Sequence, residues 1–133
     1  MIQSLDKRLS PAQAYILKER GTEPPYSSCL IHEKREGAYH CAGCGAVLFY
    51  STQKYESGCG WPSFYEEVAG AVEKKEDTSL GMRRTEITCA KCHGHLGHLF
   101  PDGPQPTGLR YCTNGLSLDF VQKPMDLGKT SVK

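Results

Sequence analysis

Two Cys-x-x-Cys pairs constrain this chain more than any other feature of its sequence. They are Cys41-Ala42-Gly43-Cys44 and Cys89-Ala90-Lys91-Cys92. In each pair a tight turn brings two thiolates to one point, as half of a tetrahedral metal site. Together the two halves predict one structural zinc ion, held by Cys41, Cys44, Cys89 and Cys92. Such an ion would clamp two strand hairpins that are distant in sequence and would offset the closure entropy of the long segment between them.

Two alternatives to a zinc site are open at these pairs. Iron also binds four thiolates, and ligand type alone does not separate the two metals. A thioredoxin-like redox role is less well supported, because neither pair opens a helix after a strand. Gly45 and Gly94 follow the two pairs, and we expect them to supply the backbone freedom that the turns need.

Length and charge favour one cytoplasmic domain. The 133 residues are expected to fold as a single domain, residues 1–133. The N-terminus lacks the apolar core of a secretory signal, and no apolar run approaches the roughly 20 residues of a membrane span. In a reducing compartment, seven cysteines are expected to be metal ligands or catalytic groups rather than structural disulfides. The 16 basic and 15 acidic residues give a net charge of +1, so nucleic-acid and membrane partners have no support.

One short amphipathic helix is predicted over residues 10–20. Ser10 is its expected N-cap, Pro11 stands at the first helical position, and Gln13 closes a capping box. Gly21 stands where a left-handed residue would end the helix. The apolar stripe at helical spacing consists of Ala12, Tyr15 and Ile16.

From residue 21 to 120 the pattern is that of short strands, which predicts a mainly β core. Strands are expected at 46–50, 85–88 and 116–120, where strand formers cluster or alternate with period two. Gly- and Pro-rich loops are expected at 57–62 and 101–108. The polar tail over 121–133 is expected to be frayed.

Three cysteines remain outside the metal site: Cys29, Cys59 and Cys112. Cys112 lies near Arg110, which would favour a thiolate, and directly before a strand, so its position suits a nucleophile. Cys59 lies between two glycines, and the mobility they give suits a cysteine that must reach a sulfenic acid. The alternative for a lone cysteine is a small buried apolar group.

A histidine cluster, His93-Gly94-His95-Leu96-Gly97-His98, follows the second cysteine pair. On an extended segment His93 and His95 share a face, and Gly97 would let His98 join one of them. Acid–base or hydrogen-bonding roles are predicted. A second metal site is the alternative, but no nearby carboxylate completes it, since Asp102 lies beyond Pro101.

With these motifs taken together, the chain resembles the methionine-R-sulfoxide reductases, which reduce the R epimer at the sulfoxide sulfur. The two Cys-x-x-Cys pairs belong to the match. The other matching stretches are 21–26, Ser57-Gly58-Cys59-Gly60-Trp61-Pro62-Ser63-Phe64, 81–87, His95-Leu96-Gly97-His98-Leu99-Phe100-Pro101-Asp102-Gly103-Pro104, 106–108 and Arg110-Tyr111-Cys112-Thr113-Asn114. The resemblance covers about 21–120 and implies two antiparallel sheets with small peripheral helices and a zinc site of four cysteines.

The resemblance also implies a thioredoxin-dependent reaction. Cys112 would be the nucleophile and Cys59 the resolving cysteine, and their disulfide would be reduced by thioredoxin. The residues that it places around the sulfoxide are His95, His98 and Asn114, with Trp61 and Phe64 binding the substrate. Oxidised proteins or peptides would be the substrates of a monomeric enzyme.

Two positions depart from the family pattern, and two other function classes are weighed against it. His93 stands where many relatives have an acidic residue and is interpreted as a surface residue. Cys29 is an additional thiol that could replace Cys59 as resolver. One alternative function is a zinc-ribbon module that binds protein or nucleic acid; the near-zero net charge argues against nucleic acid. The other alternative is a zinc hydrolase whose catalytic metal is held by the histidines. A hydrolase needs an open coordination position, which a site of four cysteines lacks.

Overall fold

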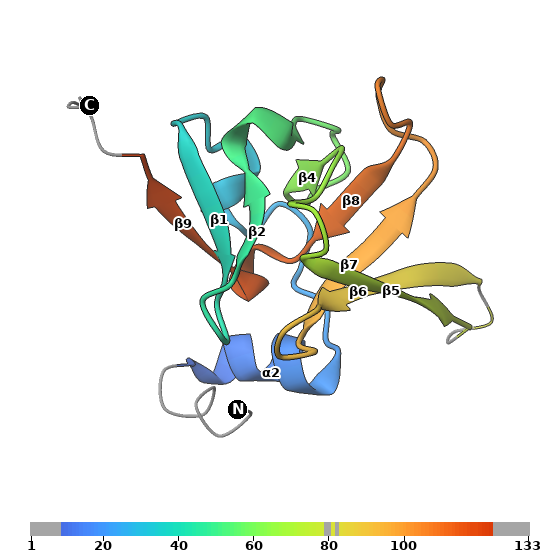
Figure 1. Cartoon of the computed structure of the whole chain (residues 1–133). Helices are drawn as coiled ribbons and strands as arrows, with labels where there is room; N and C mark the ends of the chain where they lie inside the picture. The colour runs from blue at the N-terminus through green and yellow to red at the C-terminus, as the bar shows by residue number, and fades with distance from the viewer. Residues whose placement is uncertain (1–8, 79–80, 82, 124–133) are drawn as a thin grey trace.

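Two antiparallel sheets form most of the structure, a computed structural model that describes residues 9–78, 81 and 83–123 (Figure 1). A three-stranded sheet has the order β2-β1-β9, and a six-stranded sheet has the order β3-β4-β8-β7-β6-β5. The strands are β1 Gly37–Cys41, β2 Val47–Tyr50, β3 Lys54–Tyr55, β4 Ser63–Phe64, β5 Val72–Asp77, β6 Arg84–Cys89, β7 His95–Phe100, β8 Arg110–Thr113 and β9 Leu118–Gln122. The helices are α2 Pro11–Glu19 and the short 3-10 helices η1 Cys29–His32, η2 Ser51–Gln53 and η4 Gly115–Ser117. The predicted mainly β fold with two sheets is confirmed.

Helix α2 begins as the sequence predicts, but its buried face is different. Ser10 accepts from the Gln13 N–H and Gln13 reaches back to Ser10, which completes the capping box. Ile16 is buried as predicted, but the second buried residue is Leu17, whereas Ala12 and Tyr15 of the predicted stripe are exposed. Arg20, not Gly21, takes the left-handed conformation that ends the helix. Gly21 is needed instead because a Cβ there would overlap the Tyr15 ring.

The core lies between the two sheets. Phe49 of β2 stacks on Phe64 of β4, with ring centroids 4.1 Å apart and planes 10° apart. Tyr39 of β1 meets the same Phe64 ring edge-on at 4.9 Å. All three side chains are fully buried. Phe64 is therefore a packing residue that joins the sheets, and the structure does not place it at a substrate-binding surface.

The predicted strands and loops agree with the structure apart from their boundaries. Strands β2, β6 and β9 cover the three predicted segments, although the last begins with the 3-10 helix η4 before β9. β9 pairs with β1 as far as Gln122, so the start of the predicted tail at 121 is strand. Residues 124–133 lie outside the described residues.

A β-bulge in β7 positions two histidines. Ile87 of β6 pairs with Gly97, and the next residue, Thr88, pairs with His95, so Leu96 is an extra residue in β7. An extra residue shifts the alternation of side chains by one position. His95 and His98, three residues apart, therefore lie on the same face of the sheet.

Candidate active site and metal centre

The four cysteines of the two pairs converge on one point. The Sγ atoms of Cys41 and Cys92 are 3.6 Å apart, and those of Cys44 and Cys89 are also 3.6 Å apart. All four sulfurs lie within 4.8 Å of one another. A tetrahedral zinc with Zn–S bonds of about 2.3 Å holds its sulfurs about 3.8 Å apart, which agrees with these distances. The donor set fits a metal ion, and four thiolates fill a tetrahedral site.

The metal centre links the two sheets through two matching turns. Cys41 ends β1 and Cys89 ends β6, and α2 lies beside both turns (Figure 1). Gly45 N–H donates to the Cys41 carbonyl and His93 N–H donates to the Cys89 carbonyl, both at 2.8 Å. The left-handed residues are Gly45 (φ 84°) and His93 (φ 67°).

Gly94 serves close packing rather than the turn conformation that the sequence predicted for it. A Cβ at Gly94 would lie 2.7 Å from Leu17 Cδ2 of α2. His93, which takes the left-handed conformation, is not among the residues that line the cavity of His95 and His98. Its side chain is exposed and its Nδ1 lies 3.0 Å from Glu73 Oε1. The surface position of His93 agrees with its interpretation, but His93 lies in the left-handed turn before β7 and not on the extended segment expected for it.

Cys112 and Cys59 form a close thiol pair. Their Sγ atoms are 3.4 Å apart, and both residues are half-buried. Cys112 lies in β8, while Cys59 lies in the loop before β4. Ser63 Oγ is 3.4 Å from Cys59 Sγ and 2.7 Å from Ser57 Oγ. The structure thus brings together the two cysteines that the sequence singled out for redox chemistry.

The pair shares its charge unequally. A hydrogen bond from the Cys112 thiol, supported by the hydroxyls of Ser57 and Ser63, lowers the pKa of Cys59 to about 4 against the effect of burial. The same hydrogen bond and burial raise the pKa of Cys112. Arg110 opposes this rise, as the sequence suggested, but does not outweigh it. The contact between the two sulfurs thus favours the negative charge on Cys59 over Cys112.

Two buried carboxylates orient the histidines. His95 Nδ1 lies 2.8 Å from Glu86 Oε2, and His98 Nε2 lies 2.8 Å from Asp77 Oδ2. Arg20 bridges both carboxylates, with Nη2 3.0 Å from Glu86 and 3.5 Å from Asp77. Burial lowers the pKa of His95, although Glu86 opposes the shift. His95 is therefore neutral at pH 7, with Nδ1–H donated to Glu86.

These carboxylates were missed from the sequence. The expectation that no carboxylate lies near the histidines was wrong, because Glu86 and Asp77 come from the neighbouring strands β6 and β5 rather than from the same segment. Glu86 pairs with His98 across the strands, and Asp77 pairs with Arg84. The sequence did predict the strand at 85–88, which contains Glu86. It did not show how this strand pairs with the histidine segment, so the approach of Glu86 to His95 could not be predicted.

A small cavity of about 100 Å³ collects most of the predicted site residues. They are Trp61, His95, His98, Cys112 and Asn114. Residues that the sequence reasoning did not single out, Thr22, Arg84 and Phe100, also line it. Phe64 does not belong to the lining, and Cys29 is exposed in η1 and lines a different hollow.

Asn114 and Trp61 are fixed by hydrogen bonds to the backbone. Asn114 Nδ2 donates to the Leu96 carbonyl at 3.1 Å, and its Oδ1 accepts from the Glu23 N–H at 2.9 Å. Trp61 Nε1 donates to the Glu23 carbonyl at 2.9 Å. Both side chains therefore form stable walls of the cavity.

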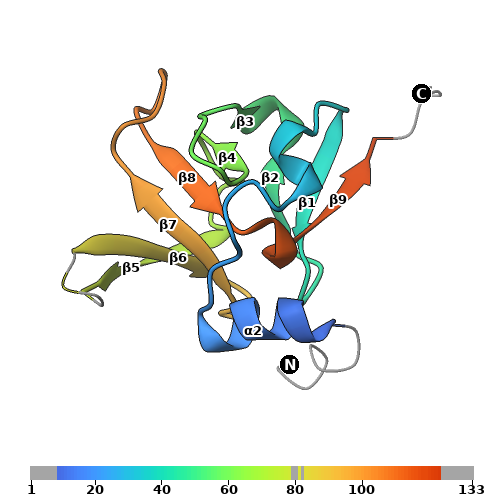
Figure 2. The same cartoon turned by 180° about the vertical axis from the view of Figure 1, so that it is seen from behind.

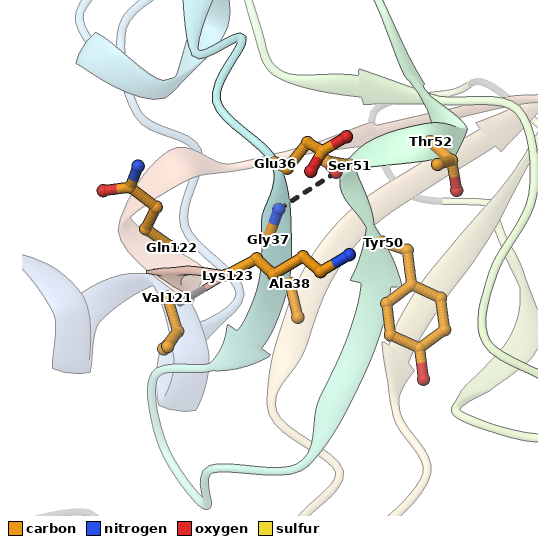
Figure 3. Close-up of a pocket in the computed structure, with 9 residues that line it drawn as sticks. All are labelled: Glu36, Gly37, Ala38, Tyr50, Ser51, Thr52, Val121, Gln122 and Lys123. Atoms are coloured by element: carbon orange, nitrogen blue, oxygen red, sulfur yellow. Dashed lines mark hydrogen bonds between the residues drawn. The ribbon is translucent and has the colours of Figure 1, made fainter. Parts of the chain in front are cut away.

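A second hollow, of about 410 Å³, lies on the three-stranded sheet (Figure 3). Ala38 lies between Tyr50 and Val121 in the pairing of β2, β1 and β9, and the side chain of its neighbour Tyr39 points into the core. The lining of this second hollow includes Glu36 and Lys123 but neither a cysteine nor a histidine. Cys112, His95 and His98 line the smaller cavity instead.

The fold and the site define the class of the protein: a two-sheet β protein with four clustered cysteines that could hold a metal ion and a separate close pair of thiols beside two imidazoles. The model of the SelR domain matches residues 9–122. The chain belongs to the methionine-R-sulfoxide reductase family, as the sequence resemblance indicated. It is 56% identical over 120 residues to proteins named peptide methionine sulfoxide reductase MsrB from Escherichia coli O139:H28 (strain E24377A / ETEC) and from Escherichia coli (strain K12 / DH10B). The matched region is 90% of this chain and 88% of each relative. Among the described residues, no helix has the length and apolar character needed to cross a membrane.

Proposed function

We propose that this protein reduces the R epimer of methionine sulfoxide in oxidised proteins or peptides, with Cys112 as the nucleophile. The observation that carries the proposal is the Cys59–Cys112 pair, with its sulfurs 3.4 Å apart, at a cavity lined by two imidazoles and a tryptophan. Family membership and the names of the relatives support the same reaction.

In the first step the oxygen of the sulfoxide is transferred to Cys112. The thiol and the sulfoxide become a sulfenic acid and methionine, so the cysteine sulfur loses the two electrons that the methionine sulfur gains. Attack requires the thiolate on Cys112, whereas the resting charge lies on Cys59. The two sulfurs are 3.4 Å apart and either can be the donor, so the proton they share can lie on Cys59 and leave the thiolate on Cys112 for the attack.

The two imidazoles have different roles toward the sulfoxide oxygen, and one of them supplies its proton. A sulfoxide oxygen is a poor leaving group until it is protonated, so a hydrogen-bond donor or acid must face it. His95 is neutral and has given its Nδ1–H to Glu86, which leaves its other nitrogen as an acceptor. His98 holds Asp77 through Nε2, and its Nδ1, when protonated, is the donor toward the oxygen. We therefore assign the acid role to His98 and the orientation of a water or of the substrate to His95.

Trp61 and the surrounding walls select the epimer. The indole offers an apolar surface to the ε-methyl group, while the imidazoles lie on the side of the oxygen. Asn114 keeps the strand end of the cavity in place through its two backbone hydrogen bonds. A pocket that distinguishes methyl, oxygen and side chain on three sides accepts one configuration at sulfur.

In the second step Cys59 closes a disulfide with the sulfenic acid and releases water. An S–S bond is about 2.05 Å long, so the sulfurs approach by about 1.4 Å from their present distance. Thioredoxin, an external dithiol, then reduces the disulfide. Cys29 is the other thiol that could act as resolver, and a Cys59→Ser variant distinguishes them.

The metal centre has a structural role in this proposal. Zinc is the ion we assign to Cys41, Cys44, Cys89 and Cys92, since it favours four thiolates in tetrahedral geometry. When bound, it fixes the ends of β1 and β6 against each other and takes no part in the reaction. We further assign the protein to the cytoplasm as a monomer.

A single-turnover experiment tests the function. Reduced protein is mixed with racemic N-acetyl-methionine sulfoxide without a reductant, and the remaining epimers are separated by chiral chromatography, with Cys112→Ser in parallel. Loss of the R epimer alone, and only in the protein with Cys112, is the expected result. Folded, metal-loaded protein that consumes neither epimer would overturn the proposal and favour a zinc-ribbon binding module.

A further inference from the structure

The segment between α2 and η1 ties several walls of the site together. Glu23 is 3% exposed, and its backbone bonds to Asn114 and Trp61 through its N–H and its carbonyl. Its carboxylate accepts the N–H groups of Gly115 at 2.8 Å and Leu116 at 2.9 Å. Four hydrogen bonds therefore fix this residue, and the segment rises from that point toward η1 (Figure 2).

Three residues later, Tyr26 contacts the Cys59 loop on both sides of the cysteine. The Tyr26 N–H donates to the Gly60 carbonyl at 2.7 Å, and its Oη donates to the Gly58 carbonyl at 2.8 Å. A Cβ at Gly60 would lie 2.8 Å from Pro25 Cβ, so the loop packs closely beneath the segment. One tyrosine thus holds both neighbours of Cys59.

The backbone of Tyr26 is strained in this position. Its φ of 62° lies in the left-handed region, which residues with a Cβ rarely adopt. The ring is 66% exposed, so burial does not explain why the conformation persists. Tyr26 follows Pro25 in a β-turn that the Ser27 N–H closes on the Pro24 carbonyl at 3.3 Å, and the third residue of a type II turn takes a positive φ. The two hydrogen bonds from Tyr26 hold this turn against the Cys59 loop.

The loop itself needs an external anchor. Gly58 (φ 79°) and Gly60 (φ 101°) are both left-handed, and glycine has access to many other conformations. Without an anchor these residues would let Cys59 move away from Cys112. The two hydrogen bonds from Tyr26 to the carbonyls of Gly58 and Gly60 restrict the conformations of both glycines.

From this geometry we propose that Tyr26 is the positioning residue for disulfide formation: it holds the Cys59 loop so that Cys59 Sγ stays within reach of Cys112 Sγ. The inference rests on the proposed function, which supplies the sulfenic acid on Cys112. In this step Cys59 loses the proton that it held during the first step, its thiolate attacks the Cys112 sulfur, the S–O bond breaks, and the oxygen takes up one proton and leaves as water. Tyr26 takes no part in these bond changes.

The test separates the two chemical steps. Tyr26→Phe keeps the ring and the backbone N–H but loses the Oη donor to Gly58. Reduced protein is mixed with N-acetyl-methionine sulfoxide without a reductant, and quenched samples are assayed for methionine and for the Cys59–Cys112 disulfide. We expect methionine to form at the wild-type rate and the disulfide to form about five-fold more slowly, as for the loss of one hydrogen bond. Dimedone-trapped sulfenic acid on Cys112 is expected to rise.

The matched control is Tyr50→Phe, which removes a hydroxyl from a 48% exposed tyrosine of the three-stranded sheet and should change neither rate. Tyr26→Ala, which also removes the ring, should slow disulfide formation at least as much as Tyr26→Phe, with metal content and near-ultraviolet circular dichroism measured to confirm the fold. Disulfide formation at the wild-type rate in Tyr26→Phe, or an equal slowing of both steps, would overturn the role of Tyr26. Absence of methionine in the wild-type protein would overturn the proposed function instead.

Discussion

Cys112 and His98 lie directly opposite each other on strands β8 and β7. Side chains at such positions share a face of the sheet, with Cβ atoms about 4.5–5.5 Å apart. Ser63 occupies the corresponding position opposite Cys112 on β4. Cys112 therefore has an imidazole on one side and a hydroxyl on the other, and that hydroxyl contacts Cys59.

Replacing His98 tests its role as the donor to the sulfoxide oxygen. We expect His98→Ala to lower the rate of methionine formation in a single turnover by about 10²- to 10³-fold, the usual contribution of a positioned acid. His93→Ala is the control, since His93 is exposed and bonds to Glu73 on the surface. Similar rates for the two variants would contradict the assignment of His98.

The charge of the thiol pair is open to direct measurement. Because Cys112 donates to Cys59 and lowers its pKa to about 4, Cys59 should react with iodoacetamide at pH 6 as a thiolate. In Cys112→Ala the donor is lost, and the midpoint of the labelling profile should move toward about 8.5, the ordinary value for cysteine. Mass spectrometry of labelled peptides gives both profiles, and identical profiles would refute the shared proton.

The burial of His95 predicts a pH dependence of stability. Its pKa is lowered in the folded protein, so the unfolded chain binds more protons at this residue just below its ordinary pKa of about 6.5. The stability that a neutral His95 contributes is complete above this pH and is lost as the pH falls, by at most about 1.4 kcal/mol per pH unit. Between pH 7 and 5 the free energy of unfolding should fall less in His95→Asn than in the wild type. His93→Gln should keep the wild-type slope, and equal slopes in all three proteins would argue against a buried, neutral His95.

Loss of one metal ligand should affect folding before chemistry. We expect Cys44→Ser to bind less than one zinc per chain and to lose more than about 3 kcal/mol of stability, because the site that links the sheets is incomplete. Metal content by mass spectrometry and urea unfolding measure the two effects. Cys29→Ser, at an exposed position, should retain both metal and stability. A stable, metal-free Cys44→Ser protein with full activity would exclude a structural metal.

Local signals in the sequence predicted the elements that depend on local chemistry. The capping box of Ser10 and Gln13, the loops around Cys59 and Asp102, and the strand over 85–88 are set by neighbours in the chain, and they appear in the structure as expected. The buried face of α2 was mispredicted because its partner, the turn at Gly94, comes from a distant part of the chain. The four metal ligands were predictable because the spacing within each pair carries the information.

The residues of the candidate site could be proposed from the sequence, but their arrangement could not. Cys59 and Cys112 have distinctive surroundings in the sequence, so they could be selected before their distance was known. Glu86 and Asp77 could not be selected, since nothing near them in the chain shows that strand pairing carries them to the histidines. The bulge at Leu96 was likewise assigned to Gly97, because a bulge depends on the register with the partner strand.

If the protein works through a reversible disulfide, as proposed, a centre of four thiolates has a further chemical consequence. Many small domains link distant strands through a structural disulfide. A dithiol that can reduce a disulfide between Cys59 and Cys112 would reduce such a structural disulfide as well. Zinc has no accessible oxidation change, so a staple made of metal and thiolates offers such a dithiol no sulfur–sulfur bond to cleave. The framework and the catalytic pair can thus be built from the same amino acid and still respond to different reagents.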